Sequence, residues 1–154
     1  MFMKLITILF ISLLVNFPVF SNMIQPNPSI EPEEVISIQL KALMNNNDPY
    51  EDSGISQTWA FAHPQNRQYT GPLSNFTLMM KSNSYSPMLN HSSHNIIFVS
   101  NSNDTSNYFV ELTDKIGNKF GFTWTVKKVV SDGEFKDCWM TSGVSRPLPL
   151  AKSA

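Results

Sequence analysis

The segment KFGFTWTVKKVV, residues 119–130, decides the fold class of this chain. Its large apolar side chains recur at every second position: Phe120, Phe122, Trp124 and Val126. The residues between them are glycine or threonine. A period of two places the apolar side chains on one face of a β-strand, so the segment predicts a strand with one buried face.

Three further segments have the same strand-like character, and they are residues 94–100, 108–113 and 137–144. Polar or glycine-containing turns separate them, including one with Gly117 and one at Ser131–Gly133. Short strands that are joined by such turns pair with their neighbours. The second half of the chain is therefore predicted to form a four-stranded antiparallel meander.

The first half has helical periodicity instead. Ile36, Leu40, Leu43 and Met44 form one apolar stripe after Pro32, which suits the first turn of a helix. Asp52 or Ser53 can cap a second helix that stops at Pro64, and Pro72 opens a third. Helices followed by strands predict an α+β fold, with three N-terminal helices packed on one face of the sheet.

Length and charge narrow the class of protein. The chain has 154 residues, a formal net charge of −1 and 15% charged residues. This length suits one domain, which we place at residues 31–146 with a tail at 147–154. The charge argues against a nucleic-acid partner, which requires a basic surface. The one cysteine, Cys138, cannot form an internal disulfide and is expected to be a small buried side chain.

The N-terminus, MFMKLITILFISLLVNFPVFSN, combines an early lysine, a short apolar run and a small-residue step at Ser21. This pattern is typical of a secretory signal peptide at residues 1–21, followed by a spacer at 22–30. The expected location is periplasmic or secreted. Two alternatives stay open, which are a plastid-type lumen and a membrane anchor formed by an uncleaved N-terminus.

Four stretches resemble a known family. They are DPYEDSGISQTWAFAHPQNRQYTGPLSNF (48–76), SYSPMLNH (84–91), GFTWTV (121–126) and DCWMTSGV (137–144), and together they resemble the domain of unknown function 4864 family. The resemblance implies a cystatin-like cone, similar to the nuclear transport factor and ketosteroid isomerase superfamily, in which three helices and a curved sheet enclose a pocket. The superfamily includes isomerases, dehydratases and non-enzymatic binding or assembly domains, so the fold does not choose a function.

The stretch WAFAHPQNRQYTGPLSNF, residues 59–76, has two interpretations. It is either a rigid corner between helices or the mouth of a pocket, where it presents side chains to a ligand. On the second interpretation, and with histidine and tryptophan from the neighbouring segments, the candidate ligand-binding residues are Trp59, His63, Arg67, Tyr69, His91 and Trp124.

Catalytic and metal sites are weakly indicated. Asp52 and His63 are the candidates for an acid–base pair, because a carboxylate in an apolar pocket has a raised pKa. His91 and His94 are three residues apart and could share a metal in a tight turn, although an extended strand would point them apart. No acid or cysteine lies at a matching offset, so we expect no metal and no cofactor.

Three hypotheses of function remain. The leading one is an exported, non-enzymatic domain that binds a small apolar or amphipathic ligand, or a partner protein, in its cone. The second is an isomerase- or dehydratase-like enzyme that transfers protons in the same pocket. The third is an assembly module that forms a homodimer through the open face of its sheet.

Overall fold

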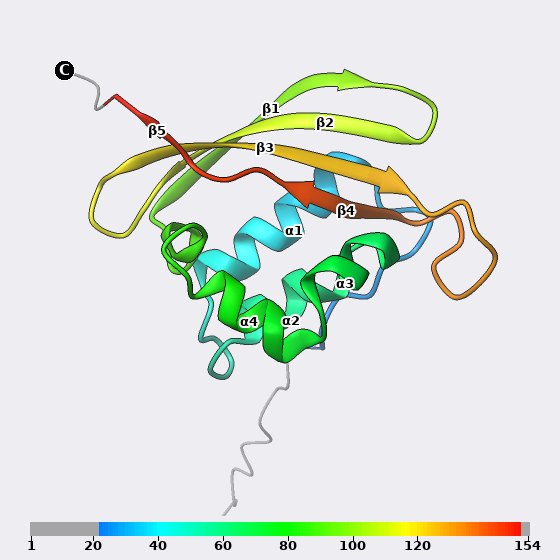
Figure 1. Cartoon of the computed structure of the whole chain (residues 1–154), viewed down its shortest axis with the longest axis horizontal. Coiled ribbons are helices and arrows are strands. Elements are labelled where there is room, and N and C mark those ends of the chain that lie inside the picture. The colour runs from blue at the N-terminus through cyan, green and yellow to red at the C-terminus, as the bar shows by residue number, and fades with distance from the viewer. Residues whose placement is uncertain (1–21, 152–154) are drawn as a thin grey trace, which may run out of the picture.

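The computed structural model describes residues 22–151, so the predicted signal peptide at 1–21 lies outside the described residues. The described part is an α+β fold with the helices before the sheet (Figure 1). The helices are α1 (Pro32–Met44), α2 (Ser53–Ala60), α3 (Pro64–Thr70) and α4 (Leu73–Met80), followed by one 3₁₀ turn, η1 (Ser86–Met88). The strands are β1 (Ser93–Asn101), β2 (Thr105–Thr113), β3 (Lys119–Lys128), β4 (Trp139–Val144) and β5 (Leu148–Leu150).

The strands form one antiparallel sheet in the order β1-β2-β3-β4. β4 pairs with the second half of β3, and β5 pairs with its first half, where Gly121 lies opposite Leu148. Both therefore lie along the same edge of β3. The segment predicted as a tail at 147–154 thus contains a short strand, and the sheet is longer at this edge than the predicted meander.

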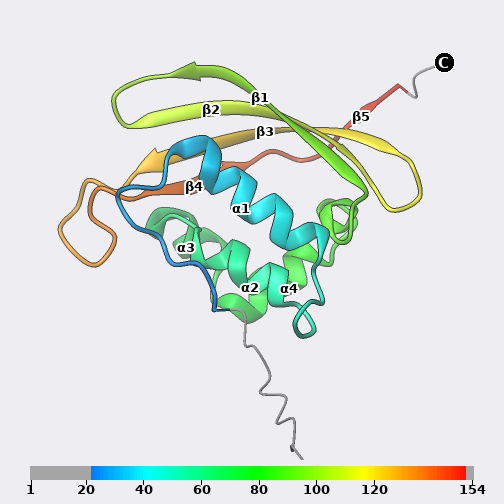
Figure 2. The ribbon, with the colours of Figure 1, turned by 180° about the vertical axis from the view of Figure 1, so that it is seen from behind.

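The helices cover one face of the sheet (Figures 1 and 2). α1 lies against the sheet, and α2 packs on α1. The predicted period-two pattern is confirmed, because Phe122, Trp124 and Val126 are buried on the face toward the helices. They meet the buried stripe of α1, which includes Ile36, Leu40 and Leu43. Burial of each such side chain contributes about 1.5–3 kcal/mol to stability.

The structure corrects the helix count. Within residues 22–151 there are four α-helices and not three, because Pro64 begins a helix as well as ending one. Proline suits the first position of a helix, since its missing N–H would have no partner there. The imidazole Nδ1 of His63 accepts a hydrogen bond from the backbone N–H of Gln65 and caps α3 at 3.2 Å. A side chain that usually titrates thus serves as a helix cap.

The residues after the predicted signal peptide are part of the fold. The side-chain amide of Gln57 on α2 accepts a hydrogen bond from the backbone N–H of Ile24 and donates one to its carbonyl, both at 2.8 Å. Ile30 is buried in the main core. Part of the segment predicted as a spacer at 22–30 therefore packs on the helical layer.

Candidate functional site

A small cavity lies between the helices and the inner face of the sheet. Its volume is about 130 Å³. The residues that line it come from α1, α2, α3, α4, η1, β3 and β4 and from the segments that join them. They are Gln39, Leu43, Thr58, Ala62, Asn66, Thr70, Phe76, Met79, Met80, Tyr85, Met88, Trp124, Thr141, Gly143 and Val144. Among these described residues, none has a side chain that is charged near neutral pH.

A chain of buried hydrogen bonds forms the polar side of the cavity. The Thr141 hydroxyl donates to Gln39 Oε1 at 2.6 Å and accepts from the Trp124 indole Nε1–H at 3.0 Å. Gln39 Nε2 in turn donates to the backbone carbonyl of Thr58 at 3.0 Å. One threonine of β4 therefore connects α1, α2 and β3 in the protein interior, where each unpaired polar group would be costly.

The backbone of Thr141 also holds the corner that follows α2. Its N–H donates to the carbonyl of Phe61, and its carbonyl accepts from the N–H of His63, both at 2.8 Å. Ala62 thus forms a parallel bridge with Thr141. The register of β4 against β3 shifts between Thr125 and Val126, where a bulge occurs. Bulges redirect side chains and commonly lie beside functional sites.

The other hydroxyl groups of the cavity donate to backbone carbonyls. Thr58 donates to Gly54, Thr70 to Asn66 and Tyr85 to Val144, at 2.9, 3.0 and 3.2 Å. The hydroxyl protons are therefore committed to the protein itself. The cavity presents thioether, aromatic and aliphatic surface to an occupant, with oxygen lone pairs at its polar side.

Trp59 and Arg67 support the wall of the cavity from behind. The Trp59 ring packs on Phe76 with 5.1 Å between ring centroids, and the Arg67 guanidinium lies 5.1 Å from the Trp59 ring. Arg67 Nη2 donates to the carbonyls of Trp59 and Ala60, which are at the C-terminal end of α2. A cation at this position stabilises the negative end of the helix dipole. Arg67 is a support for the corner in this geometry.

His63 is buried under the same corner. Burial lowers its pKa from the ordinary value of 6.5, and the nearby charge of Lys127 lowers the pKa further. Its Nδ1 is the cap of α3, as described above. His63 is not one of the described residues that line the cavity.

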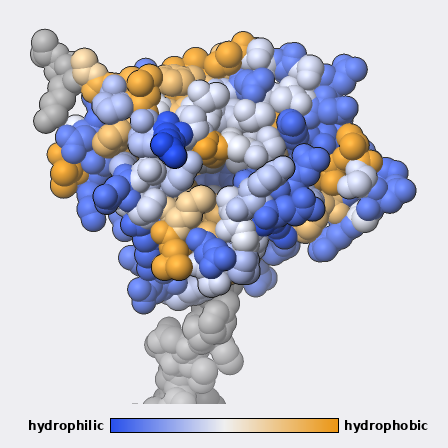
Figure 3. All heavy atoms as spheres, in the orientation of Figure 1, coloured by the Kyte–Doolittle hydropathy of each residue, from blue (hydrophilic) through white to orange (hydrophobic). Residues whose placement is uncertain are grey.

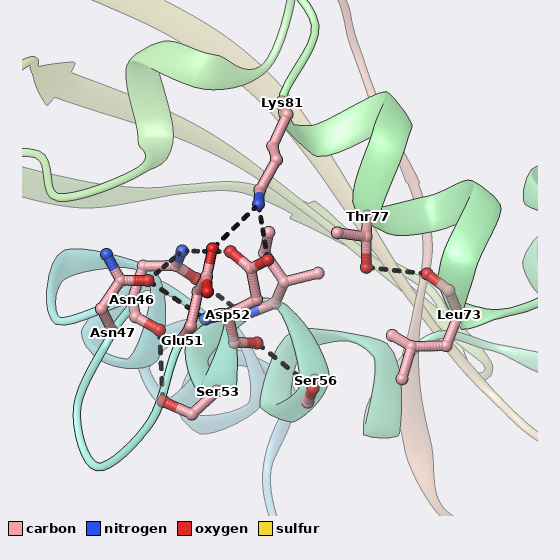
Figure 4. Close-up of polar contacts among 10 residues, drawn as sticks. Asn46, Asn47, Glu51, Asp52, Ser53, Ser56, Leu73, Thr77 and Lys81 are labelled. Atoms are coloured by element: carbon pink, nitrogen blue, oxygen red, sulfur yellow. Dashed lines mark hydrogen bonds and ion pairs between the residues drawn. The ribbon is translucent and has the colours of Figure 1, made fainter.

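Asp52, the other acid–base candidate, lies in a polar cluster at the start of α2, where residues that follow α1 and α4 meet it (Figure 4). Its carboxylate forms an ion pair with Lys81 at 2.6 Å and accepts a hydrogen bond from Asn46 Nδ2 at 3.0 Å. Asp52 occupies the cap position of α2, but its side chain makes no capping bond there and its backbone is left-handed, with φ of 61°. The prediction of a side-chain cap is therefore wrong, because Asn46 and Lys81 hold the carboxylate instead.

His91 and His94 lie side by side. His91 Nδ1 is 2.7 Å from the carbonyl of Met88, so this nitrogen carries a proton and donates it. His91 Nε2 therefore accepts from His94 Nδ1, also at 2.7 Å. Burial lowers the pKa of both rings. Within residues 22–151, no group of three or more histidine, cysteine, aspartate or glutamate residues is arranged to hold a metal ion.

The structure brings few of the predicted ligand residues together. Trp124 lines the cavity, Trp59 and Arg67 lie behind its wall, and His91 is buried beside the start of β1. Tyr69 is 89% exposed and is not among the residues that line the cavity. Sequence reasoning missed Gln39 and Thr141. Gln39 carried a usable signal, because it is a polar residue beside the apolar stripe of α1.

Comparison of the chain with protein-family models, curated proteins and solved structures finds no match. The resemblance to the domain of unknown function 4864 family therefore stays a prediction, as does the cone shape that it implies. In the described part of the chain, no helix has the length and apolar character needed to cross a bilayer.

Proposed function

We propose that this protein binds a small, uncharged and mainly apolar molecule in the cavity around Trp124. The observation that carries the proposal is the composition of the lining, which combines aromatic, aliphatic and thioether groups with no described charged side chain. Small-molecule sites are typically apolar cavities with a few placed polar groups. Residues 1–21 support export, so we further propose that the ligand is met outside the cytoplasm.

The polar side of the cavity favours an uncharged ligand. Thr141 and Gln39 are already bonded to each other, and the hydroxyl protons of Thr58, Thr70 and Tyr85 are bonded to carbonyls. A buried ligand charge would find no counter-ion, and an unpaired buried charge is strongly unfavourable. One hydroxyl or N–H on the ligand could donate to an oxygen lone pair on this side.

The volume sets the size of the ligand. A buried apolar cavity of about 150 Å³ in another protein stays dry and binds benzene. The cavity here, at about 130 Å³, suits a single aromatic ring or an aliphatic molecule of similar volume. A cone-like envelope of helices on a curved sheet, as the resemblance implies, would enclose such a molecule.

The same geometry gives less support to proton-transfer catalysis. A general base has to lie within hydrogen-bond reach of the proton that it removes. Asp52 is bound by Lys81 and Asn46, and His63 caps α3, so neither is aimed at the cavity. The binding hypothesis requires neither residue to act on the occupant.

The test compares benzene, toluene and phenol with benzoate as probes. We expect the uncharged probes to raise the melting temperature of the purified protein, by an amount that grows with probe concentration, and benzoate to have no effect. At 100 times its dissociation constant, a probe that binds only the folded state adds about 2.7 kcal/mol to the free energy of unfolding.

Two variants locate the binding. Val144→Phe adds volume inside the cavity and should abolish the effect of the probes, whereas Leu78→Phe adds the same ring at a position that is 71% exposed on α4. Equal responses of the two variants, or stabilisation by benzoate as large as that by toluene, would overturn the proposal. Intrinsic tryptophan fluorescence, to which Trp59 and Trp139 also contribute, gives an independent readout of the environment of Trp124 when the two variants are compared.

A further inference from the structure

The two edges of the sheet differ in how they are protected. Along the β4–β5 edge, the corner after α2 bridges Thr141 through Ala62. Beyond it, Pro147 and Pro149 have no N–H to offer to another strand. Proline residues and covering segments are common protections against edge-to-edge association. This edge is therefore closed.

The opposite edge contains no proline, and its one irregularity is a shift of the β1–β2 register between Phe98 and Ser100. β1 spans nine residues and contains no lysine, arginine, aspartate, glutamate or proline. Phe98 is 54% exposed and Val99 is 59% exposed. Among the strands that the structure describes, β2 alone pairs with β1. Figure 3 shows apolar surface along the top of the molecule, where β1 lies in Figure 1. A long, uncharged, apolar edge strand is a template for pairing with another strand.

We propose that β1 pairs antiparallel with β1 of a second copy of this chain, so that two sheets join into one. Nine residues extend for about 30 Å, which allows several main-chain hydrogen bonds between the copies. A two-fold axis near Ile97 would place Ile96 of one copy opposite Phe98 of the other. The apolar residues at the centre of β1 then face each other, Val99 lies opposite Asn95, and no lysine, arginine, aspartate or glutamate of β1 opposes another.

The charges on α1 select a second copy as the occupant. Glu31 and Glu33, at the start of α1, line the same surface depression as Phe98 and Asn101, at the end of β1. Lys41, near the end of α1, lies close enough to His94 at the start of β1 for its positive charge to lower the pKa of that histidine. α1 therefore runs opposite to β1. An antiparallel pair brings the acidic end of one α1 toward Lys41 of the second copy, and such complementarity guides association.

The open face of the sheet is less suited to this role than the edge. Glu111 on this face is exposed. The hydroxyl of Thr125 donates to Asn107 Oδ1 at 2.9 Å, so the middle of the face is polar and internally bonded. Pairing along the edge satisfies main-chain groups that would otherwise bond water, and it covers Phe98 and Val99.

The first experiment measures the mass of the purified protein in solution by sedimentation over a range of micromolar concentrations. We expect a monomer–dimer equilibrium. Val99→Lys would place a lysine on the edge strand itself, opposite Asn95 of the second copy, and should weaken association by about tenfold or more, because a charged side chain on an edge strand opposes edge-to-edge pairing. Ile116→Lys, at a turn position that is 76% exposed, is the matched control and should associate like the original protein.

A second set of variants leaves the strand unchanged, so it tests the proposal even where Val99→Lys fails to fold. Glu33→Lys and Lys41→Glu, both on the exposed side of α1, should each weaken the dimer, and the double variant should recover most of the association. A monomer at every concentration overturns the proposal and leaves the edge to a strand of another protein. A dimer that is equally stable in Val99→Lys and Ile116→Lys also overturns it, and points to the sheet face.

Discussion

Thr141 connects α1, β3 and the corner after α2 in the interior. Its side chain and its backbone together make five hydrogen bonds, with Gln39, Trp124, Phe61, His63 and Asn66. The alternation of β4 indicated a strand but did not distinguish Thr141 from any other threonine. Its partners are distant in sequence, and Gln39 is 102 residues away. Such partners become visible when the strands and helices have been placed in space.

The substitution Thr141→Val tests this role, because valine has nearly the shape of threonine without its hydroxyl. The change leaves Gln39 Oε1 and Trp124 Nε1–H without their partner in the interior. We expect the free energy of unfolding, measured with urea, to fall by about 2–4 kcal/mol. Thr123→Val, on the exposed outer face of the sheet, is the control and should change stability by less than about 0.5 kcal/mol. A loss of the same size in both variants would contradict the role of the buried network.

At the scale of elements, the packing of α2 on α1 depends on Gly54. A Cβ atom at this position would lie 2.2 Å from the carbonyl oxygen of Ala42, so α2 approaches the backbone of α1 more closely than any other residue permits. The N–H of Gly54 donates to the carbonyl of Asn46, and Asn46 Oδ1 accepts from the N–H of Ile55. Helix periodicity predicted both helices, but not the distance between them.

Gly54→Ala is therefore expected to be strongly destabilising. One added methyl group forces the two helices apart, and we expect a loss of about 3 kcal/mol or more in the free energy of unfolding. Gly143→Ala is the matched control, because a Cβ there meets nothing within 4 Å. Thermal and urea unfolding of the two variants give the comparison. Equal stability of the two would show that α1 and α2 can separate without cost.

For the whole molecule, burial of three histidines links stability to pH. The pKa values of His63, His91 and His94 are all lowered from 6.5, chiefly because burial disfavours their charged forms. Below about pH 6.5 the unfolded chain takes up protons that the folded protein resists. The stabilisation is thus complete above 6.5 and declines as the pH falls through the lowered pKa values.

We expect the urea midpoint of unfolding to be constant from about pH 8 to 7 and to fall between about pH 6.5 and 5, before most carboxylates titrate. Replacing His91 and His94 with asparagine removes two of the three titrating groups. The variant should show a shallower decline over the same interval, whatever its stability at pH 8. A decline of unchanged slope would mean that the histidines do not cause it.

The amino-acid pattern by itself determined the α+β class, the approximate positions of β1 to β4 and the buried face of β3, because alternation and helical periodicity are local properties of the chain. The burial of Cys138 also agreed with expectation. The sequence predicted the candidate site less well than it predicted the fold. Of the predicted ligand residues Trp124 lines the cavity, whereas Tyr69 is exposed and Arg67 holds the end of α2. The cavity is built where seven elements meet, through contacts between residues far apart in the sequence. Only the tertiary structure sets those contacts, because side-chain chemistry indicates which groups need partners but not which partners packing will supply.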